Sequence, residues 1–196
     1  MNPRKISPIS ALNQAIMERF PAPPQLTGPD EAVTPIYVLG LPRSGTTLVE
    51  AMLGAHAHVH PLGEQITAGR LLYPLIEAGT EFGAGEIAEY LEKERQMLPA
   101  LPEGTAAYTD KMPENYRLIG FLKTVHPGAR FVHLRRDPRD VALSMWRGHF
   151  AGSALNYTYD LRAMAHRFNL YAEIMAFWHR LLPGEILDLP YEEITA

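Results

Sequence analysis

The sequence of 196 residues contains no cysteine. This excludes disulfides, thiolate metal ligands and cysteine nucleophiles, and it is compatible with a reducing compartment. The chain also lacks an apolar run of about 18 residues, and no apolar segment of signal-peptide length follows the charged first residues. We therefore expect a cytoplasmic protein that has no contact with a membrane.

Positive charge is not in excess, because 18 lysines and arginines face 22 aspartates and glutamates, giving a formal net charge of −4. No global field attracts nucleic acid, so an anionic ligand must be held by local groups. Hydrophobic residues make up 46% of the chain, enough for one sizeable core. We expect residues 1–34 to form an N-terminal helix and a proline-rich tether, and residues 35–196 to form one globular domain.

Strand and helix patterns alternate along the chain. Strands are predicted at 35–40, 58–62, 130–135 and 185–189, and helices at 9–20, 45–56, 64–78, 84–98, 113–125 and 159–182, with one more beginning at Asp137-Pro138. This alternation predicts an α/β fold, a mostly parallel sheet with helices on both faces. Ligand sites in such folds lie at the carboxyl ends of the strands.

Residues 40–47 read Gly-Leu-Pro-Arg-Ser-Gly-Thr-Thr and follow an apolar run at 36–39. This is the glycine spacing of a P-loop at a strand-to-helix turn, where backbone N–H groups converge on an anion. The lysine that a nucleoside triphosphatase carries in this loop is missing, and Thr46 stands in its place. Arg43 is a loop cation suited to a phosphate or sulfuryl group. The sequence therefore predicts a phosphate site that does not perform ordinary ATP hydrolysis.

A second charged motif has Arg136 at the end of a strand and Ser144 about two turns into the next helix. An arginine and a serine placed in this way can bind a second phosphate. The alternative is that Arg136 and Arg139 form salt bridges with the aspartates next to them on a solvated surface. The position after a strand, beside a P-loop, favours the phosphate site.

The chain resembles the sulfotransferases that use 3′-phosphoadenosine 5′-phosphosulfate, and within them the branch of protein-tyrosine sulfotransferases and bacterial relatives often fused to tetratricopeptide repeats. Four segments carry the resemblance in order, at 42–48, 63–64, 110–113 and 136–144, with 190–193 as a weaker fifth. They span nearly the whole chain. The resemblance implies a P-loop-like sulfotransferase domain over residues 35–196 that binds this nucleotide as donor and requires no metal.

The resemblance also implies roles for individual residues. The 5′-phosphosulfate would be held by Arg43, Ser44, Gly45, Thr46 and Thr47, the 3′-phosphate by Arg136 and Ser144, and the nucleotide site would be lined by Tyr191. Backbone amides and hydroxyls suit this task because they donate to tetrahedral oxyanions without a metal. Tyr191 equally fits an ordinary aromatic residue at the end of a strand.

Two further residues match catalytic positions of the family. Glu64 occupies the place of the base that deprotonates the acceptor, and Lys111 that of the lysine supporting the leaving group and the sulfuryl oxygens. With Arg43, Lys111 would offset charge developing on the bridging oxygen. From spacing alone, Glu64 reads as a carboxylate stabilised at a helix N-terminus and Lys111 as a solvent-facing charge. The resemblance reverses both preferences.

Histidines raise a metal hypothesis that we do not adopt. His56, His58 and His60 alternate as on one side of a strand, but no carboxylate cluster with metal-ligand spacing accompanies them. Three others have no recognisable partner in the sequence: His149, His166 and His179. Apolar residues from Leu161 to Trp178 lie on one face of the helix expected at 159–182, and the stripe from Met164 to Trp178 is predicted to be core.

Members of the resembling family continue past the position of residue 196 into a helix and a loop that closes over the nucleotide, so the domain is expected to be C-terminally short. The cysteines and membrane anchor of the animal secretory enzymes are also absent. Two alternatives stay open: a non-catalytic nucleotide-binding or interaction domain, and a P-loop kinase. The missing lysine and the lack of a Walker B aspartate after a strand argue against the kinase. The expected acceptor is a hydroxyl on a peptide tyrosine, a carbohydrate or a small molecule, and a homodimer stays open.

Overall fold

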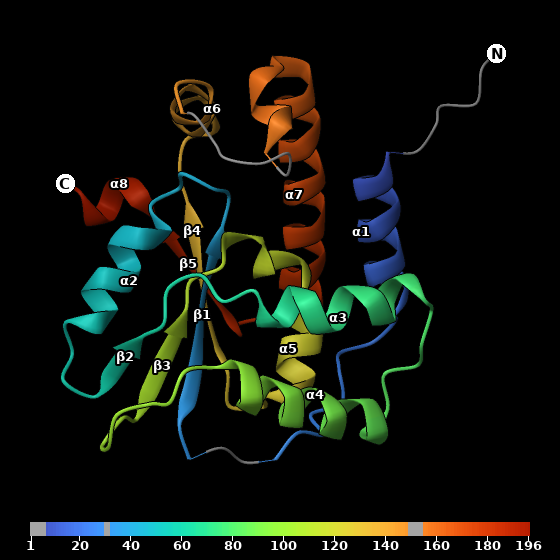
Figure 1. The fold of residues 1–196 in the computed structure, drawn as a ribbon. Coiled ribbons are helices and arrows are strands. Elements are labelled where there is room, and N and C mark those ends of the chain that lie inside the picture. Colours follow the sequence, from blue (N-terminus) through green and yellow to red (C-terminus); the bar gives the residue numbers. More distant parts are fainter. Residues whose placement is uncertain (1–6, 30–31, 149–154) are drawn as a thin grey trace.

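The computed structural model describes residues 7–29, 32–148 and 155–196. Its sheet has five strands in the order β2-β3-β1-β4-β5 (Figure 1). They are β1 (Thr34–Gly40), β2 (Val59–Pro61), β3 (Ala107–Asp110), β4 (Arg130–Arg135) and β5 (Ile186–Pro190). Every pairing is parallel, so the carboxyl ends of the strands meet at one edge of the sheet. The predicted α/β fold is confirmed.

Helices fill the connections between the strands, and one more helix lies at each end of the chain. They are α1 (Pro8–Glu18), α2 (Thr46–Gly54), α3 (Thr67–Glu77), α4 (Ala84–Met97), α5 (Ile119–Val125), α6 (Pro138–Trp146), α7 (Leu161–Leu181) and α8 (Tyr191–Ile194), with 3₁₀ turns η1 (Pro113–Arg117) and η2 (Asn156–Tyr159). As predicted, α6 begins with Asp137 as its cap, whose carboxylate accepts from the Arg139 N–H at 2.8 Å. The cap fixes the start of the helix that carries Ser144.

The helix predicted at 113–125 is divided into η1 and α5 by Leu118, whose backbone is not helical. The indole N–H of Trp178 donates to the carbonyl of Tyr116 at 2.8 Å. That carbonyl is therefore bonded to a side chain of α7 rather than to a continuing α-helix. The break between η1 and α5 thus coincides with a contact to Trp178, which lies far away in the chain and cannot be read from the local sequence.

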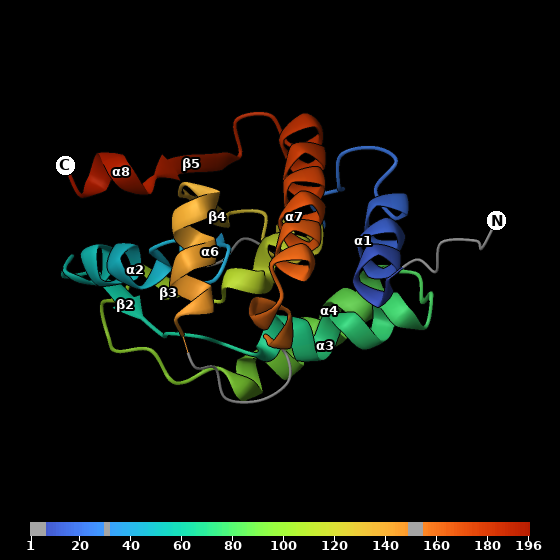
Figure 2. The same ribbon diagram turned by 90° about the horizontal axis from the view of Figure 1, so that it is seen from above.

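Alternate residues of β1 face two different layers. Tyr37 and Leu39 belong to the larger core with α1, α3, α4, α5 and α7. Val38 faces the other way and packs with Val49 of α2 and Val132 of β4. Figures 1 and 2 show α2 and α8 on one side of the sheet and α1, α5 and α7 on the other. Because β1 is packed on both faces, the loop that follows it stands on a rigid strand.

The first helix of the chain, α1, and the long helix α7 both contribute side chains to the larger core. Ile16 of α1 and Phe20 just after it are buried there. Of the stripe predicted on α7, Met164 and Trp178 are buried, whereas Leu161 at its first turn is exposed. The prediction of a core stripe therefore holds beyond the first turn of α7.

The strand β3 was not predicted. It has only four residues and completes the sheet by pairing with β1 on one side and β2 on the other, so its formation depends on neighbours. Asp110 ends this strand beside β1, which corrects the expectation that no aspartate follows a strand near the P-loop. Its side chain is buried, however, and bonded to Gln65 and Asn115.

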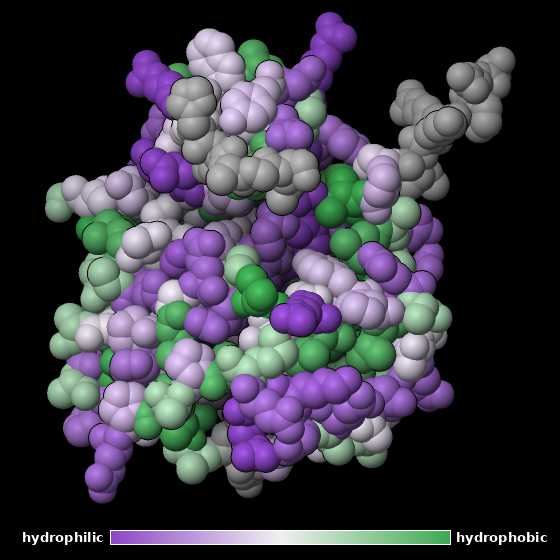
Figure 3. Space-filling view, in the orientation of Figure 1, coloured by the Kyte–Doolittle hydropathy of each residue, from purple (hydrophilic) through white to green (hydrophobic). Residues whose placement is uncertain are grey.

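Hydrophilic and hydrophobic residues are interspersed on the face of the molecule seen in Figure 3. Within the described ranges, none of the helices combines the length and apolar character needed to cross a membrane.

Candidate active site

A cavity of about 560 Å³ lies at the carboxyl edge of the sheet. Segments that follow all five strands contribute to its lining, which consists of Pro42, Arg43, Gly45, Thr46, Thr47, Glu64, Met112, Pro113, Glu114, Arg136, Ser144, Leu155 and Tyr191. Its size falls within the range of about 300–1,000 Å³ found for small-molecule sites. The topology therefore gathers distant motifs around one space.

The P-loop forms the floor between β1 and α2. Gly45 is the N-cap of α2, with φ of 107° and no side chain to cap the helix, so the first N–H groups of α2 remain for an anion. Arg43 has φ of 70°, a left-handed conformation that costs a residue with a side chain about 1–2 kcal/mol. Such strain is typical of loops held in place for a ligand.

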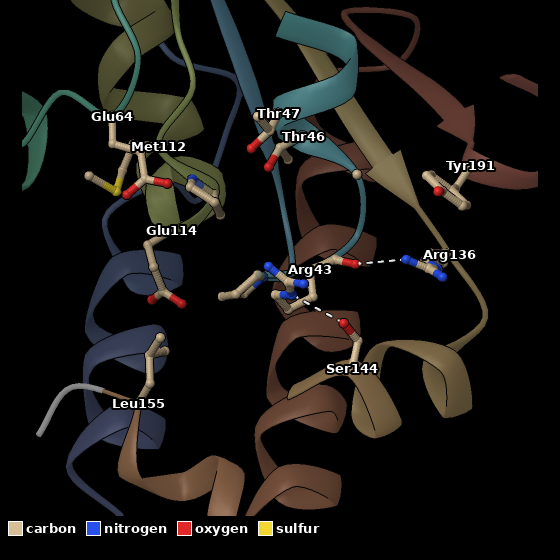
Figure 4. A pocket seen from close by; sticks show the side chains of 13 residues that line it. Arg43, Thr46, Thr47, Glu64, Met112, Glu114, Arg136, Ser144, Leu155 and Tyr191 are labelled. Carbon is tan, nitrogen blue, oxygen red and sulfur yellow. Dashed lines mark hydrogen bonds between the residues drawn. The ribbon is translucent and has the colours of Figure 1, made fainter. Parts of the chain in front are cut away.

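One wall of the cavity is basic (Figure 4). Arg43 Nε donates to Ser144 Oγ at 3.1 Å, and Arg136 Nη1 donates to the carbonyl of Arg43 at 3.2 Å. The Arg136 guanidinium also lies over the ring of Tyr191, 4.2 Å from its centre. Arg136 Nε is buried with no hydrogen-bond partner in the described structure. The guanidinium of Arg136 is therefore held by the P-loop carbonyl and the Tyr191 ring, with one of its N–H groups buried and unpaired among the described residues.

The surface salt-bridge alternative for this motif applies to one arginine only. Arg139 pairs with Asp137 at 2.6 Å and is exposed. Arg136 turns to the P-loop and to Tyr191 instead. The predicted association of Arg136, Ser144 and the loop is thus found in the structure.

The opposite wall is acidic. Glu64 Oε1 lies 2.6 Å from Lys111 Nζ, and this lysine is 7% exposed while the Glu64 side chain reaches solvent. Glu64 precedes α3, whose N-cap is Ile66, so it is not in the first turn of that helix. Lys111 is not a solvent-facing charge. Lys111 contacts Glu64, which lines the cavity, but Lys111 is not itself a lining residue.

Glu114 is the second carboxylate on the acidic wall. It forms ion pairs with Arg117 and, at 2.9 Å, with Arg167. Although burial raises the pKa of Glu114, these guanidinium groups outweigh it and hold the pKa below its usual value. Glu114 is therefore ionised and committed to its arginines, which leaves Glu64 as the more accessible carboxylate.

Ser44 differs from the rest of the predicted loop. It is buried, its N–H donates to the Leu41 carbonyl at 3.1 Å, and its hydroxyl has no partner among the described residues. It lines a neighbouring cavity of about 540 Å³ instead. Arg43, Gly45, Thr46 and Thr47 line the first cavity as expected. Leu155 and the wall role of Glu114 were not predicted, because neither residue belongs to a motif with a diagnostic spacing.

The histidines do not form the strand cluster that prompted the metal hypothesis. His56 and His58 precede β2, and the His58 N–H donates to His56 Nδ1 at 3.2 Å. Two histidines expected to lack partners have them: His166 contacts Ser7 Oγ at 3.1 Å, and His179 contacts Asp188 Oδ1 at 3.1 Å. The remaining one, His149, lies outside the described residues.

A different group with metal-binding side chains connects α7 to the sheet. His133, His179 and Asp188 place one ligand atom each within 4.8 Å of the others. His133 Nδ1 is 2.6 Å from Asp188 Oδ1, and its other ring nitrogen contacts the Tyr171 hydroxyl. Burial lowers the pKa of His133, with the Asp188 carboxylate opposing this shift. Asp188 Oδ1 thus lies close to both imidazoles, and the three side chains form one polar group between α7 and the sheet.

Fold and cavity together define an α/β protein with a P-loop-like turn at the carboxyl edge of its sheet. The sequence model described as "Sulfotransferase family" matches residues 35–196, and the chain belongs to this family. An uncharacterized protein of Aquifex aeolicus is 34% identical over 178 residues, covering 82% of this chain and 23% of that protein. A Caenorhabditis briggsae protein, provisionally named a protein-tyrosine sulfotransferase, is 26% identical over 173 residues, covering 81% and 59%.

This chain thus spans less than two thirds of the length of both relatives. Among solved structures, the sulfotransferase STF9 of Mycobacterium avium is 14% identical. That comparison has a TM-score of 0.48 and covers 95% of this chain and 65% of the other.

Proposed function

We propose that this chain binds 3′-phosphoadenosine 5′-phosphosulfate and transfers its sulfuryl group to a hydroxyl or phenol acceptor. One observation supports this above the rest. A single cavity joins a P-loop without lysine, a basic wall of two arginines and a serine, and a Glu64–Lys111 ion pair. These are the groups that such a transfer needs at donor, leaving group and acceptor.

On the donor side, the loop amides with Thr46 and Thr47 would hold the 5′-phosphosulfate. Arg136 and Ser144, which line the same cavity, would bind the 3′-phosphate. Hydrogen bonds to charged groups contribute roughly 1.5–3 kcal/mol each. Tyr191 holds Arg136 in place through the ring contact. Ser44, which faces the other cavity, would support the loop conformation rather than touch the donor.

On the acceptor side, Glu64 would take the proton of the acceptor hydroxyl. The acceptor oxygen would form a bond to sulfur as the bond between sulfur and the bridging phosphate oxygen breaks, releasing the bisphosphate. Lys111 and Arg43 would offset the negative charge that develops on the bridging phosphate oxygen. The Glu64–Lys111 contact of 2.6 Å couples the base to the cation that stabilises the leaving group.

A kinase-like use of the P-loop is the weaker alternative. Asp110 stands where a Mg²⁺ ligand could follow β3, but it is 4% exposed and is not among the cavity-lining residues. Peptide tyrosine, a carbohydrate hydroxyl and a small molecule are all candidate acceptors. A cytoplasmic location, a homodimer and a mechanism without metal belong to the same proposal.

Calorimetric titration tests the donor site. We expect 3′-phosphoadenosine 5′-phosphate to bind tightly, ATP with Mg²⁺ to bind weakly, and Arg136→Ala to lose most of the bisphosphate affinity. Preferred binding of ATP with Mg²⁺ would contradict the proposal and favour the kinase. Bisphosphate binding without release of sulfate from the donor to water or to any offered phenol would favour the non-catalytic nucleotide-binding domain.

A further inference from the structure

The backbone on each side of Glu64 is held by a buried carboxylate from a different element. The N–H of Gly63 donates to Glu50 Oε1 at 2.9 Å. The N–H of Gln65 donates to Asp110 Oδ1 at 3.3 Å. Glu50 belongs to α2, the helix that begins at the P-loop, and Asp110 is the last residue of β3. The candidate base therefore stands between two fixed points.

Glu50 is a costly residue for its position. It is 8% exposed, and its Oε1 accepts a second hydrogen bond from Thr109 Oγ1 at 2.9 Å. Both described donors are neutral, and a buried carboxylate held by neutral donors is expensive compared with an apolar side chain of similar size. Packing alone thus does not explain a carboxylate at position 50. The hydrogen bond that it accepts from the Gly63 amide gives a reason for it.

Asp110 has the same character. It is 4% exposed, and its second oxygen accepts from Asn115 Nδ2 at 2.9 Å. Burial raises the pKa of Asp110 to about 7, while the hydrogen bonds from Gln65 and Asn115 oppose this shift. Asp110 precedes Lys111 in the chain and accepts a hydrogen bond from the residue that follows Glu64. It is therefore next to both members of the Glu64–Lys111 pair.

Further backbone bonds make the segment 62–65 a continuation of the sheet. The Leu62 N–H donates to the Thr109 carbonyl at 3.1 Å, and the Lys111 N–H donates to the Gly63 carbonyl at 2.9 Å. Gly63 has φ of 71°, which glycine adopts without strain. The segment therefore turns at Gly63 and presents Glu64 toward the cavity.

We propose that Glu50 and Asp110 are positioning residues that fix the backbone of residues 63–65 and so hold the Glu64 carboxylate against Lys111 at the acceptor side. This inference rests on the proposed function of Glu64 as base. It adds a connection between that base and the donor loop, because Glu50 is part of the helix that the P-loop begins. Neither carboxylate lines the cavity, so both act through Glu64.

Amide hydrogen exchange tests the anchoring without any need for turnover. Glu50→Met removes the acceptor and Glu50→Gln keeps a carbonyl oxygen at its place. Asp110→Leu removes the second acceptor, and Asp110→Asn keeps a carbonyl oxygen at its place. We expect exchange at Gly63 to rise about tenfold in Glu50→Met and to return toward wild type in Glu50→Gln, and exchange at Gln65 to follow the same pattern in Asp110→Leu and Asp110→Asn. Unchanged exchange at both amides would overturn the proposal.

A matched control is Glu94→Met, since Glu94 is also buried, accepts from the Tyr90 hydroxyl at 3.0 Å and pairs with His126 at 2.9 Å. We expect it to leave exchange at Gly63 and Gln65 unchanged. Equal acceleration there would mean that loss of any buried carboxylate loosens the protein, against the specific role. Should Glu50→Met not fold, Glu50→Gln and Thr109→Val carry the comparison, because each keeps part of the anchor.

Turnover separates this inference from the proposed function. Sulfate release from the donor to water and sulfuryl transfer to p-nitrophenol are measured beside calorimetric binding of the bisphosphate. We expect Glu50→Met and Asp110→Leu to lower kcat about tenfold or more with unchanged donor KM and bisphosphate affinity. Faster exchange with unchanged kcat would overturn the positioning role. A wild type that binds the bisphosphate without turnover would contradict the proposed function, while exchange still decides the anchoring.

Discussion

The ring of Tyr191 occupies the place where a side chain at position 45 would project. A Cβ atom on Gly45 would stand 2.4 Å from Tyr191 Cδ2, closer than real atoms approach. The same ring lies 4.2 Å from the guanidinium carbon of Arg136. One aromatic side chain thus contacts both the P-loop and the arginine expected to hold the 3′-phosphate.

We predict that Gly45→Ala lowers bisphosphate affinity at least about tenfold, since the methyl group must displace Tyr191 and the residue has φ of 107°. Calorimetry measures the loss. Gly79→Ala is the control, because Gly79 also has positive φ, of 69°, but has open space around it. It should cost about 1 kcal/mol of stability and leave affinity unchanged. Equal affinity in Gly45→Ala and wild type would contradict the predicted clash.

Arg43 should show a conflict between stability and binding. In its left-handed conformation, glycine is favoured over alanine, so Arg43→Gly should be more stable than Arg43→Ala by about 1 kcal/mol. Both variants lose the guanidinium, and both should bind the bisphosphate more weakly than wild type. Urea unfolding measures the difference in stability between the two variants, and calorimetry measures their affinity for the bisphosphate. A less stable glycine variant would mean that position 43 is not strained.

Arg136 and Arg139 lie three residues apart but have different surroundings. Arg136→Ala removes the contacts to Arg43 and Tyr191 and should lower bisphosphate affinity by about ten- to a hundredfold, the effect of one or two charge-assisted bonds. Arg139→Ala removes only a salt bridge to Asp137 of a largely exposed arginine and should change affinity by less than about twofold. Similar losses in both variants would point to a diffuse electrostatic effect.

Glu64→Gln tests the assigned base. General base catalysis contributes about a hundredfold to ten-thousandfold, so we expect kcat for sulfuryl transfer to fall by at least about a hundredfold. Bisphosphate affinity should stay near that of wild type, because Glu64 lies on the opposite wall from Arg136 and Tyr191 (Figure 4). Retention of the full transfer rate would assign the proton acceptor to another group.

Asp110 makes stability depend on pH in a defined direction. Burial raises its pKa from 3.8 to about 7, so the folded state holds the proton more tightly than the unfolded state. The preference of the folded state for protonated Asp110 contributes fully to the free energy of unfolding below about pH 4. This contribution is lost as the pH rises through about 7. Between pH 5 and 8, wild type should lose on the order of 2 kcal/mol more than Asp110→Asn. Urea unfolding at several pH values measures this, and the opposite slope would reject the raised pKa.

The elements that the sequence predicted well carry their own signals. The P-loop spacing, the Asp137-Pro138 helix start and the apolar strand after Arg130 each depend on residues adjacent in the chain. The fold class follows from their alternation, and Arg136 could be placed near the loop because parallel strands end at one edge of the sheet.

What the sequence missed depends on distant partners. Strand β3 is stabilised by two neighbouring strands rather than by its four residues, and without it Asp110 and Lys111 could not be located. Ser44 lines a cavity together with residues of α7, and His179 contacts Asp188 of β5, so both surroundings depend on segments far away in the chain. Spacing within a motif says which residues are near a ligand, but not which way each side chain turns.

The bond between Arg43 and Ser144 also affects how a ligand can bind. Both groups are already hydrogen-bonded to each other at 3.1 Å, so an anion entering between them exchanges one partner for another. The net gain from each contact is smaller than it would be for two free donors. Discrimination benefits, because a ligand that fails to satisfy both groups leaves this bond broken without compensation. In the proposed donor site, the pair would therefore favour anions with the correct shape over anions that offer charge alone.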